Sequence, residues 1–577
     1  MATQTATAAH SILAADFGSV NTRVVLLDVV GGQYRLLLRA QTLTTAAPPY
    51  ADVGVGLRRA LEQMSGILGR LLFSGDDLVT TGQAESGVDL FLATASGGKP
   101  MKAVLVGLMP DISVASGRRA LASTYVELTD TLSLADIRNT EDQVNAILRS
   151  QPDVIFIVGG TDYGATESML SLLRTVRLAV LLARGQKPVV LYAGNEALRP
   201  VVKGMMGDEV SLYMAKNVRP SLQDEQLAGA QLELALVYGA YKSVSVGGFE
   251  EVQKASRLGI LPTAQSYSNV VRYLGELPGA GVGVLCVDVG SSTVTLCASI
   301  QKEPYVSIRS DLGLGHSAVT GVRAVGAASI QRWLTFNASE SLIMDYAWNK
   351  TLKPSTVPQT PQDLEIEYAM TRAMIRNAVA SARAGWPVGQ RGDLLPAMRP
   401  IIGAGSVLAQ SIDPGISALL LLDSLQPVGV SELRLDPYGV IAALGSIAYV
   451  EPLAVAQVLE LGGLLNLGTA FSPLGRPQAA TAMQVTVKRA NGQTTEHEVK
   501  SGTLQLVELP TGQKAQVTIK LSRGLTLNGK SRLTLNVEGG AAGLIFDGRG
   551  RPIAVPKEVE KRAELLPRWY TAVRSNV

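Results

Sequence analysis

The sequence predicts an α/β protein of several domains in which one supersecondary plan occurs twice. A chain of 577 residues is too long for a single hydrophobic core. Strand-like apolar runs alternate with segments of helical spacing, a pattern typical of an α/β sheet. The order of strand, Gly-Ser turn, two further strands and helix begins at Ser11 and again at Val282. We therefore expect a duplicated architecture.

The two copies share their local signals. In the first, strands flank a Gly-Ser turn after Asp16, and a third strand follows the turn at Gly31 and Gly32. From Asp52 to Leu72 apolar residues recur at helical spacing, which predicts a helix that returns over the sheet. The second copy repeats this order from Asp288, and a segment predicted to be helical follows its third strand.

Changes in pattern along the chain predict six regions. They are a flexible tail at 1–11, a first α/β domain at 12–165, an inserted α/β subdomain with connecting helices at 166–280, a second α/β domain at 281–478, a β-rich module at 479–555 and a C-terminal helix at 556–577. The β-rich module is predicted as a separate unit from alternating apolar residues between Asn-Gly turns. On the helix predicted at 363–384, Arg372, Arg376 and Arg383 could serve a partner surface, but a solvated face is the favoured interpretation.

Composition argues against several classes of function. The 52 basic and 49 acidic residues nearly cancel, so neither a nucleic acid nor an anionic membrane is expected as a partner. The three histidines lie far apart, which disfavours a zinc cluster. The most apolar stretch, Tyr438–Thr469, is interrupted by Glu451 and Glu460, so no membrane helix is expected. The two cysteines lie in apolar segments predicted to be strands, and no disulfide is expected between them. This fits a protein of the reducing cytoplasm.

The sharpest chemical signal is the pair of turns that follow Asp16 and Asp288. Each places an aspartate at a strand end before a glycine and hydroxyl residues. Glycine lets the backbone approach a phosphate closely, and N–H and hydroxyl groups can donate to its oxygens. An aspartate can hold a hydrated magnesium ion that bridges phosphates. One such turn is an ordinary hairpin, but its repetition indicates a phosphate site built from two loops.

Three further features have both a functional and a structural interpretation. The strand in Arg399–Val407 ends in a GxGS turn at Gly403–Ser406, which suits packing against adenine and ribose or close packing of strand and helix. Asp162 follows a buried strand and can orient water or metal, or simply occupy a polar turn. His316 can donate to a ligand, although a hydrogen-bonded loop histidine is the simpler interpretation.

These segments resemble, in order and spacing, the phosphate-1, phosphate-2 and adenosine motifs of the superfamily of actin, heat-shock chaperone ATPases and sugar kinases. More specifically, residues 12 to 475 resemble the MutL/GlmL family of accessory proteins associated with glutamate mutase. The segments that carry this resemblance are DFGSVNTRVVLLD, PDVIFIVGGTDYG, VVLYAGN, DVGSSTVTL and EPLAVAQVLELGGLLNLGTAFSPLG.

The resemblance implies duplicated actin-like (ribonuclease H-like) ATPase domains, ATP and Mg²⁺ as cofactors, and a protein partner such as an adenosylcobalamin-dependent mutase. Asp16 and Asp288 would hold the metal, and together with Asp162 they are the candidate catalytic residues. The residues expected to contact the nucleotide are Gly18, Ser19, Asn21, Thr22, Arg23, Gly290, Ser291, Ser292, Thr293, Gly403, Gly405 and Ser406.

The chain departs from the family pattern at both loops. Thr22 and Arg23 stand where the family has Thr-Lys, and Thr293-Val294-Thr295 stands where it has Thr-Thr-Asp. An acidic group is thus absent from the second loop, and we expect at most a slow ATPase. Two alternatives remain open: a self-associating actin-like filament scaffold, and a small-molecule kinase in which Asp162 would be the catalytic carboxylate.

Overall fold

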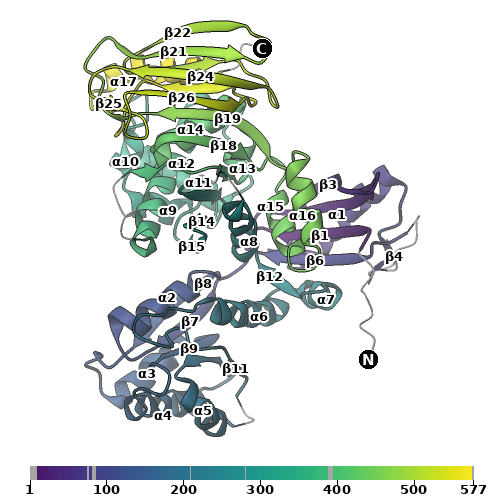
Figure 1. Ribbon diagram of the computed structural model, residues 1–577. Helices are drawn as coiled ribbons and strands as arrows, with labels where there is room; N and C mark the ends of the chain where they lie inside the picture. Colours follow the sequence, from purple (N-terminus) through teal and green to yellow (C-terminus); the bar gives the residue numbers. More distant parts are fainter. Residues whose placement is uncertain are drawn as a thin grey trace. The chain divides into compact units, whose positions relative to one another are not determined.

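The computed structural model describes residues 9–74, 77–80, 86–207, 210–277, 279, 281–387 and 394–574 (Figure 1). The chain divides into two compact units, one of residues 1–26 and 40–266, the other of residues 27–39 and 267–577. Most of the tail expected at 1–11 lies outside the described residues, and Ser11 already begins the first strand. Across the described ranges, no helix is long and apolar enough to cross a membrane.

The first sheet contains the predicted meander. Its order is β12-β6-β1-β2-β3, with β1, β6 and β12 parallel. The strands are β1 (Ser11–Phe17), β2 (Asn21–Val30), β3 (Gln33–Leu43), β6 (Leu90–Ala95) and β12 (Ile260–Pro262). Helix α1 (Val53–Leu68) follows the meander as predicted, and the Asp52 side chain caps it by accepting from the Gly54 N–H.

A second sheet, entirely parallel, lies between β6 and β12 in the chain and has the order β11-β10-β9-β7-β8. Its strands are β7 (Met101–Val106), β8 (Val126–Leu132), β9 (Val154–Gly159), β10 (Val189–Gly194) and β11 (Leu212–Met214). One face packs on α3 (Thr140–Ser150), α4 (Glu167–Leu182) and α5 (Arg199–Met206), the other on α2 (Ala115–Leu121) and α6 (Ala228–Ser245) (Figure 1). This is a doubly wound arrangement.

The inserted sheet therefore begins well before the boundary expected at residue 165. β7, β8 and β9 lie within the range 12–165, yet they pair with β10 and β11 rather than with β1 or β6. The physical reason is that buried parallel strands all read as similar apolar runs, so the sequence does not reveal which strands pair.

The sheet of the second unit repeats the order of the first. β15-β14-β13-β17-β18 has the same arrangement as β3-β2-β1-β6-β12, a meander beside parallel strands. These strands are β13 (Gly283–Val289), β14 (Val294–Ile300), β15 (Glu303–Arg309), β17 (Ile401–Ala404) and β18 (Pro427–Leu435). The predicted duplication of the α/β plan is confirmed. Helices α12 (Pro361–Ala382) and α14 (Pro414–Leu425) contribute to the core beneath.

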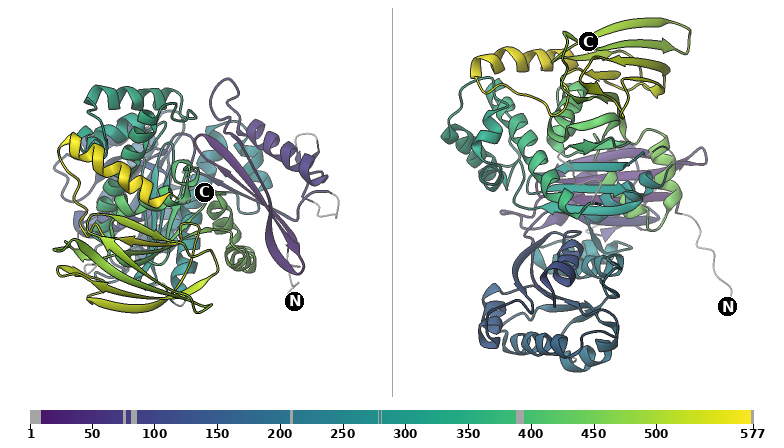
Figure 2. Two further views of the ribbon diagram at one scale, coloured as in Figure 1. Left: turned by 90° about the horizontal axis from the view of Figure 1, so that it is seen from above. Right: turned by 60° about the vertical axis from the view of Figure 1, so that its left-hand side comes forward.

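The β-rich region is not separate from this unit. β21 (Thr481–Arg489), β22 (Thr494–Lys500), β24 (Lys514–Leu521) and β26 (Arg532–Glu538) form a four-stranded antiparallel sheet. In contrast, β27 (Leu544–Asp547) pairs in parallel with β19 (Leu465–Ser472) and extends the larger sheet, with β23 (Leu504–Val507) at its edge. Helix α17 (Val559–Val573) adds Leu566 and Trp569 to the same core (Figure 2). Alternation predicts strands but not their partners.

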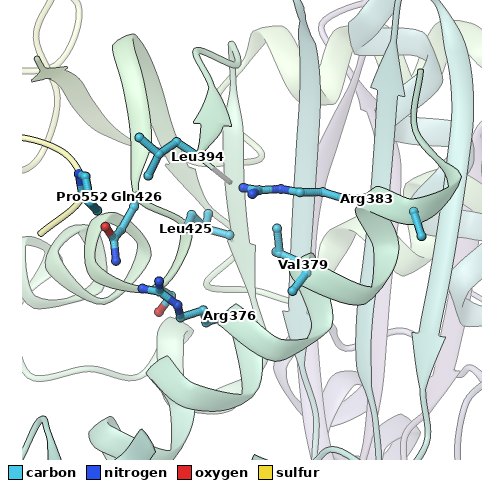
Figure 3. A pocket seen from close by; sticks show the side chains of 10 residues that line it. Arg376, Val379, Arg383, Leu394, Leu425, Gln426 and Pro552 are labelled. Atoms are coloured by element: carbon cyan, nitrogen blue, oxygen red, sulfur yellow. The ribbon is translucent and has the colours of Figure 1, made fainter. Parts of the chain in front are cut away.

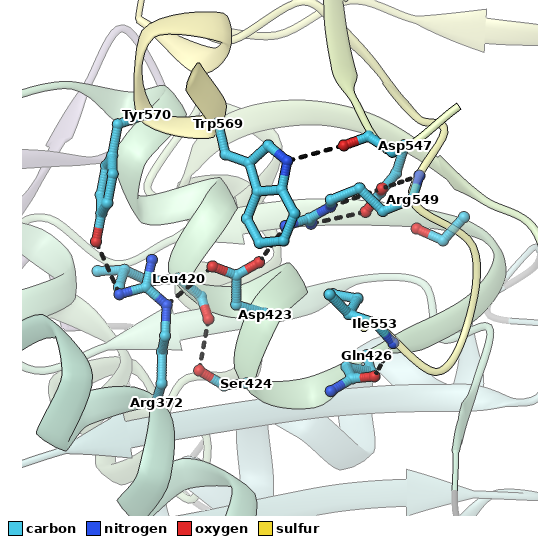
Figure 4. Close-up of polar contacts among 12 residues, drawn as sticks. Arg372, Leu420, Asp423, Ser424, Gln426, Asp547, Arg549, Ile553, Trp569 and Tyr570 are labelled. Atoms are coloured by element: carbon cyan, nitrogen blue, oxygen red, sulfur yellow. Dashed lines mark hydrogen bonds and ion pairs between the residues drawn. The ribbon is translucent and has the colours of Figure 1, made fainter. Parts of the chain in front are cut away.

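A network of buried charges joins α12, α14 and the segment after β27 (Figure 4). Asp423 accepts from Arg372 Nε at 2.8 Å and from an Arg549 terminal nitrogen at 2.7 Å. Asp547 accepts from Arg549 and from Arg551, each at 2.8 Å. The five side chains are at most 2% exposed, and each forms at least one ion pair with another member of the network. Such a set tolerates the loss of one member poorly.

The network corrects the expectation of a solvated arginine face on α12. Arg372 is buried, donates also to the Tyr570 hydroxyl, and stacks on the Trp333 ring. Arg383 is buried as well, and only Arg376 of the three is exposed. The partners come from segments 51 and 198 residues away in the chain, so helical periodicity alone could not reveal them.

We predict that Asp423→Ala lowers the free energy of unfolding by about 3–5 kcal/mol, because two buried guanidinium groups lose their carboxylate. Urea denaturation followed by circular dichroism measures this change. As a control, Lys254→Met removes the exposed ion pair with Glu250 and should leave the transition nearly unchanged. A decrease in the free energy of unfolding below about 1 kcal/mol for Asp423→Ala would show that the network contributes little to the stability of this unit.

Candidate functional site

The first loop, Gly18–Val20, is held closed by its own backbone and by Thr44. The Gly18 N–H donates to the Asn21 carbonyl at 3.0 Å. The Thr44 hydroxyl donates to the Gly18 carbonyl at 2.8 Å, so the Thr22 hydroxyl, 2.9 Å from it, must donate to Thr44. Thr22 is completely buried. This placement assigns Thr22 to the support of the loop, whereas Gly18 and Ser19 remain half-buried and accessible.

Asp16 lies at the end of β1 between two hydroxyl groups. Its Oδ1 accepts from Thr94 Oγ1 of β6 and from Thr263 Oγ1, which follows β12, each at 2.7 Å. Burial raises the pKa of Asp16 above its ordinary value of 3.8, while the two hydroxyls and the charge of Arg23 oppose that rise. The carboxylate is thus pre-positioned at the carboxyl ends of parallel strands, where α/β sheets bind ligands.

The turn after β6 lies directly beneath the first loop. The N–H groups of Ser96 and Gly97 both donate to the Phe17 carbonyl at 3.0 Å. A Cβ at Gly97 would lie only 2.7 Å from the Gly18 carbonyl oxygen, so only glycine permits this approach. The position of Gly18 and Ser19 therefore depends on the backbone at 96–97.

The second loop, Gly290–Thr293, closes in the same way. The Gly290 N–H donates to the Thr293 carbonyl at 2.9 Å, the counterpart of the bond from Gly18 to Asn21. Asp288 is the penultimate residue of β13, as Asp16 is of β1. Ser291 and Ser292 are half-buried, while Thr293 is buried. In the β13–β14 pairing, Thr295 stands opposite Asp288, and its hydroxyl is buried without a hydrogen-bond partner in the described part of the chain.

His316 contacts the second loop rather than standing apart from it. Its backbone N–H donates to Ser291 Oγ at 3.0 Å, and its Nδ1 lies 2.9 Å from the same oxygen. His316 is exposed overall, but the protein atoms around its ring remove part of the hydration of the charged form, which lowers the pKa of His316 and favours the neutral ring. Ser317 Oγ donates to the Ser292 carbonyl at 2.9 Å. The segment around His316 thus fixes the second loop.

The GxGS turn lies beside the second loop. β17 pairs in parallel with β13, and Ala404 is in register with Asp288. A Cβ at Gly405, where φ is +91°, would lie 2.2 Å from the Val289 carbonyl oxygen, so the turn packs directly on the strand end. Directly after β18, the Asp436 N–H donates to the Gly403 carbonyl at 2.9 Å. The Asp436 carboxylate accepts from the N–H groups of Val440 and Ile441 at the start of the following helix.

Asp162 lies in the inserted sheet, not in the sheet that carries Asp16. It follows β9, and its Oδ1 accepts from the Glu196 N–H at 2.9 Å and from Asn217 Nδ2 at 2.8 Å. Its own N–H donates to the Pro220 carbonyl. These hydrogen bonds join neighbouring loops to one another. They favour the interpretation of Asp162 as an aspartate of a polar turn.

Four residues that support the loops were missed by sequence reasoning: Thr94, Thr263, Gly97 and Asp436. Thr94 and Thr263 are isolated threonines 78 and 247 residues from Asp16, so no local signal marks them. Gly97 lies in a Gly97-Gly98 turn after a strand, a weak signal for close approach. Asp436 directly follows the end of β18, which is a second local signal.

Both units thus present the same constellation at the carboxyl ends of parallel strands. Among the described residues, no three His, Cys, Asp or Glu side chains gather as a metal cluster. A magnesium ion that keeps several waters and is shared with phosphates does not require such a cluster. Asp16 and Asp288 each carry carboxylate oxygens, the ligand type that this ion prefers.

A cavity of about 690 Å³ occurs elsewhere in the second unit, between the ends of α12 and α14 (Figure 3). Arg376, Arg383 and Gln426 line it together with apolar side chains. Gln426 Oε1 accepts from the Ile553 N–H. None of its described lining residues belongs to the two loops or the GxGS turn, so this cavity is distinct from the constellation.

The repeated meander, the paired loops and the aspartates at strand ends define an actin-like α/β protein. The family model described as "MutL protein" matches residues 12–461, and the chain therefore belongs to the MutL family. Protein MutL of Clostridium tetanomorphum is 24% identical over 480 residues, which cover 77% of this chain and 97% of that protein.

Two solved structures illustrate more distant similarity. Nucleotide-free acetone carboxylase is 12% identical, covers 88% of this chain and 82% of its own, and gives a TM-score of 0.31. The nucleotide-free diol dehydratase-reactivating factor is 12% identical, covers 76% and 99%, and gives a TM-score of 0.30. Since these scores are low, the fold assignment depends on the strand orders and the family match.

We predict that Asp16→Asn stabilises the nucleotide-free protein near neutral pH, because asparagine can still accept from Thr94 and Thr263 without a buried charge. Since the folded-state pKa is raised, the folded state binds more protons above pH 3.8, and wild-type stability falls as pH rises through that window. The advantage of Asp16→Asn should therefore be smaller near pH 4 than at pH 7. Thermal midpoints in chelator measure it, and a lower midpoint for Asp16→Asn at pH 7 contradicts this account.

Proposed function

We propose that this protein binds Mg-ATP through its two loops and uses nucleotide-driven closure to act on a protein partner. The observation that carries the proposal is the repeated loop geometry. An aspartate is the penultimate residue of the strand, and a glycine N–H donates to the carbonyl three residues on, at 3.0 Å in one copy and 2.9 Å in the other. Such repetition is hard to explain by packing alone, because the loops come from different units.

The accessible members of each loop are the proposed phosphate ligands. Gly18, Ser19, Gly290, Ser291 and Ser292 are half-buried, so their N–H and hydroxyl groups can reach a ligand. Asn21 contributes its carbonyl to loop closure, and Arg23 lies close enough to Asp16 to favour its charged form.

The nucleoside is assigned to the turn at Gly403–Ser406. Gly405 and Ser406 are half-buried, and the turn is packed on the end of β13, next to the second loop. A ribose and base held there would be adjacent to phosphates held by Gly290–Ser292.

Asp16 and Asp288 are the proposed ligands of magnesium and its waters. Bound magnesium would neutralise phosphate charge and orient the triphosphate. Thr295 stands opposite Asp288, where the family pattern has an acidic residue, so the second loop offers one carboxylate rather than two on that face. We therefore expect binding to be retained and hydrolysis to be slow.

A protein partner is favoured by the surface of the inserted sheet. Five apolar side chains that are each more than half exposed lie on loops that follow β7, β8, β9 and β11: Met109, Leu134, Ile137, Tyr163 and Leu222. Exposed apolar side chains gathered at one end of a sheet are typical of protein-binding surfaces.

The charges beside these side chains are paired within the chain. Arg138 pairs with Asp130 and Asp136, and Arg119 with Glu225. This pairing does not favour a polyanionic partner. Membership of the MutL family points to an enzyme partner such as an adenosylcobalamin-dependent mutase.

We predict that saturating Mg-ATP raises the thermal midpoint of the wild-type protein. A ligand that binds only the folded state at about 100 times its Kd stabilises it by roughly 2.7 kcal/mol. Asp16→Asn and Asp288→Asn should each lose most of this shift, because each removes a charge from the proposed magnesium site. Differential scanning fluorimetry with and without Mg-ATP measures it.

Asp162→Asn is the matched control, because the asparagine oxygen can still accept from Glu196 and Asn217. It should keep the wild-type shift and any ATPase activity. If the thermal midpoint of the wild-type protein does not change at millimolar Mg-ATP, the proposal is wrong. Loss of turnover only in Asp162→Asn would instead favour a small-molecule kinase.

A further inference from the structure

Helix α6 connects the two sheets of the first unit. Its first half packs on the inserted sheet, where Ala230, Leu234 and Val237 join the core that contains β9 and β10. Its second half packs on the other sheet: the Tyr238 hydroxyl donates to the carbonyl of Ala95, the last residue of β6, at 3.0 Å. One rigid element thus contacts both the inserted sheet and the sheet that carries Asp16.

Near the end of α6, Lys242 contacts the turn beneath the first loop. Its Nζ donates to the Gly97 carbonyl at 2.6 Å and to the Lys99 carbonyl at 3.1 Å. Gly97 in turn packs on Gly18 and Ser19, where a Cβ would lie 2.7 Å from the Gly18 carbonyl oxygen. Lys242 therefore contacts Gly97, and Gly97 contacts the loop proposed to hold phosphate.

The environment of Lys242 is unusual for a lysine. The residue is 1% exposed, and its ammonium group lies 5.2 Å and 5.6 Å from the ring centres of Tyr238 and Tyr241. Burial lowers the pKa of Lys242 to about 8. Within the described ranges, its hydrogen-bond partners are carbonyl oxygens rather than a carboxylate. A buried charge of this kind costs stability, whereas a methionine would fill the same space without that cost.

We propose that Lys242 is a positioning residue that couples the first loop to the inserted sheet. When a phosphate orders Gly18 and Ser19, the turn at 96–99 is fixed with them, and Lys242 transmits this ordering to α6. The consequence is a change at the loops at the carboxyl end of the inserted sheet, where the exposed apolar side chains lie. Coupling of two sites in this way is reciprocal, so a partner bound at the inserted sheet would also alter nucleotide affinity. The inference rests on the proposed nucleotide site.

The test is hydrogen–deuterium exchange of the full chain with and without Mg-ATP. In the wild type we expect slower exchange at 16–22 and 290–293, together with a change of at least about five-fold at 107–114, 133–139 and 160–166. Lys242→Met should retain protection at 290–293 but lose the change at the inserted sheet. Tyr238→Phe, which removes a different hydrogen bond of the same helix, should behave as the wild type.

Each outcome has a distinct meaning. If the wild type is protected at both loops while the inserted sheet is unaffected, the coupling does not exist, whatever the variants do. If Lys242→Met keeps the wild-type change, Lys242 has only a structural role, even if the variant is less stable. If no segment of the wild type responds and its thermal midpoint is unmoved, the proposed nucleotide site itself fails, and the coupling with it.

Discussion

Close approach of backbone to backbone at the carboxyl ends of the strands is the constraint on which both loops depend. Gly97 lies beneath Gly18, and Gly405 lies against Val289, in each case too near for a side chain to intervene. The neighbouring parallel strand therefore constrains the position of each loop, in addition to the hydrogen bonds within its hairpin. Within each hairpin, the glycine N–H donates to the carbonyl three residues on, so both loops also have the same closing hydrogen bond.

Buried charged side chains have different kinds of hydrogen-bond partner near the first loop and in the second unit. The network of Arg372, Asp423, Asp547, Arg549 and Arg551 pairs each charge with an opposite one. In contrast, the direct hydrogen-bond partners of Asp16 and Lys242 are neutral hydroxyls and carbonyls. Removing one member of such a paired network leaves a buried charge without its partner, whereas charges with neutral partners, as beside the proposed ligand site, are typical of functional sites.

Much of the fold could be predicted from the sequence because its signals are local. The turns after Asp16 and Asp288 each combine a strand end, a glycine and hydroxyls within a few residues, and the meanders around them formed as expected. What could not be predicted depends on pairing across long separations. Thr263 reaches Asp16 from 247 residues away, and β7 to β9 join the inserted sheet although they resemble their neighbours. Thr22 shows a third limit, because a hydroxyl in a motif can face the fold instead of the ligand.

We propose that both loops bind the phosphates of one nucleotide. The most direct measurement is an experimental structure of the full chain with magnesium and a non-hydrolysable ATP analogue. We expect one analogue whose phosphate oxygens accept hydrogen bonds from Gly18–Ser19 and from Gly290–Ser292, with its nucleoside against Gly405 and Ser406. An analogue bound through only one loop, or in the cavity lined by Arg376 and Arg383, would contradict it.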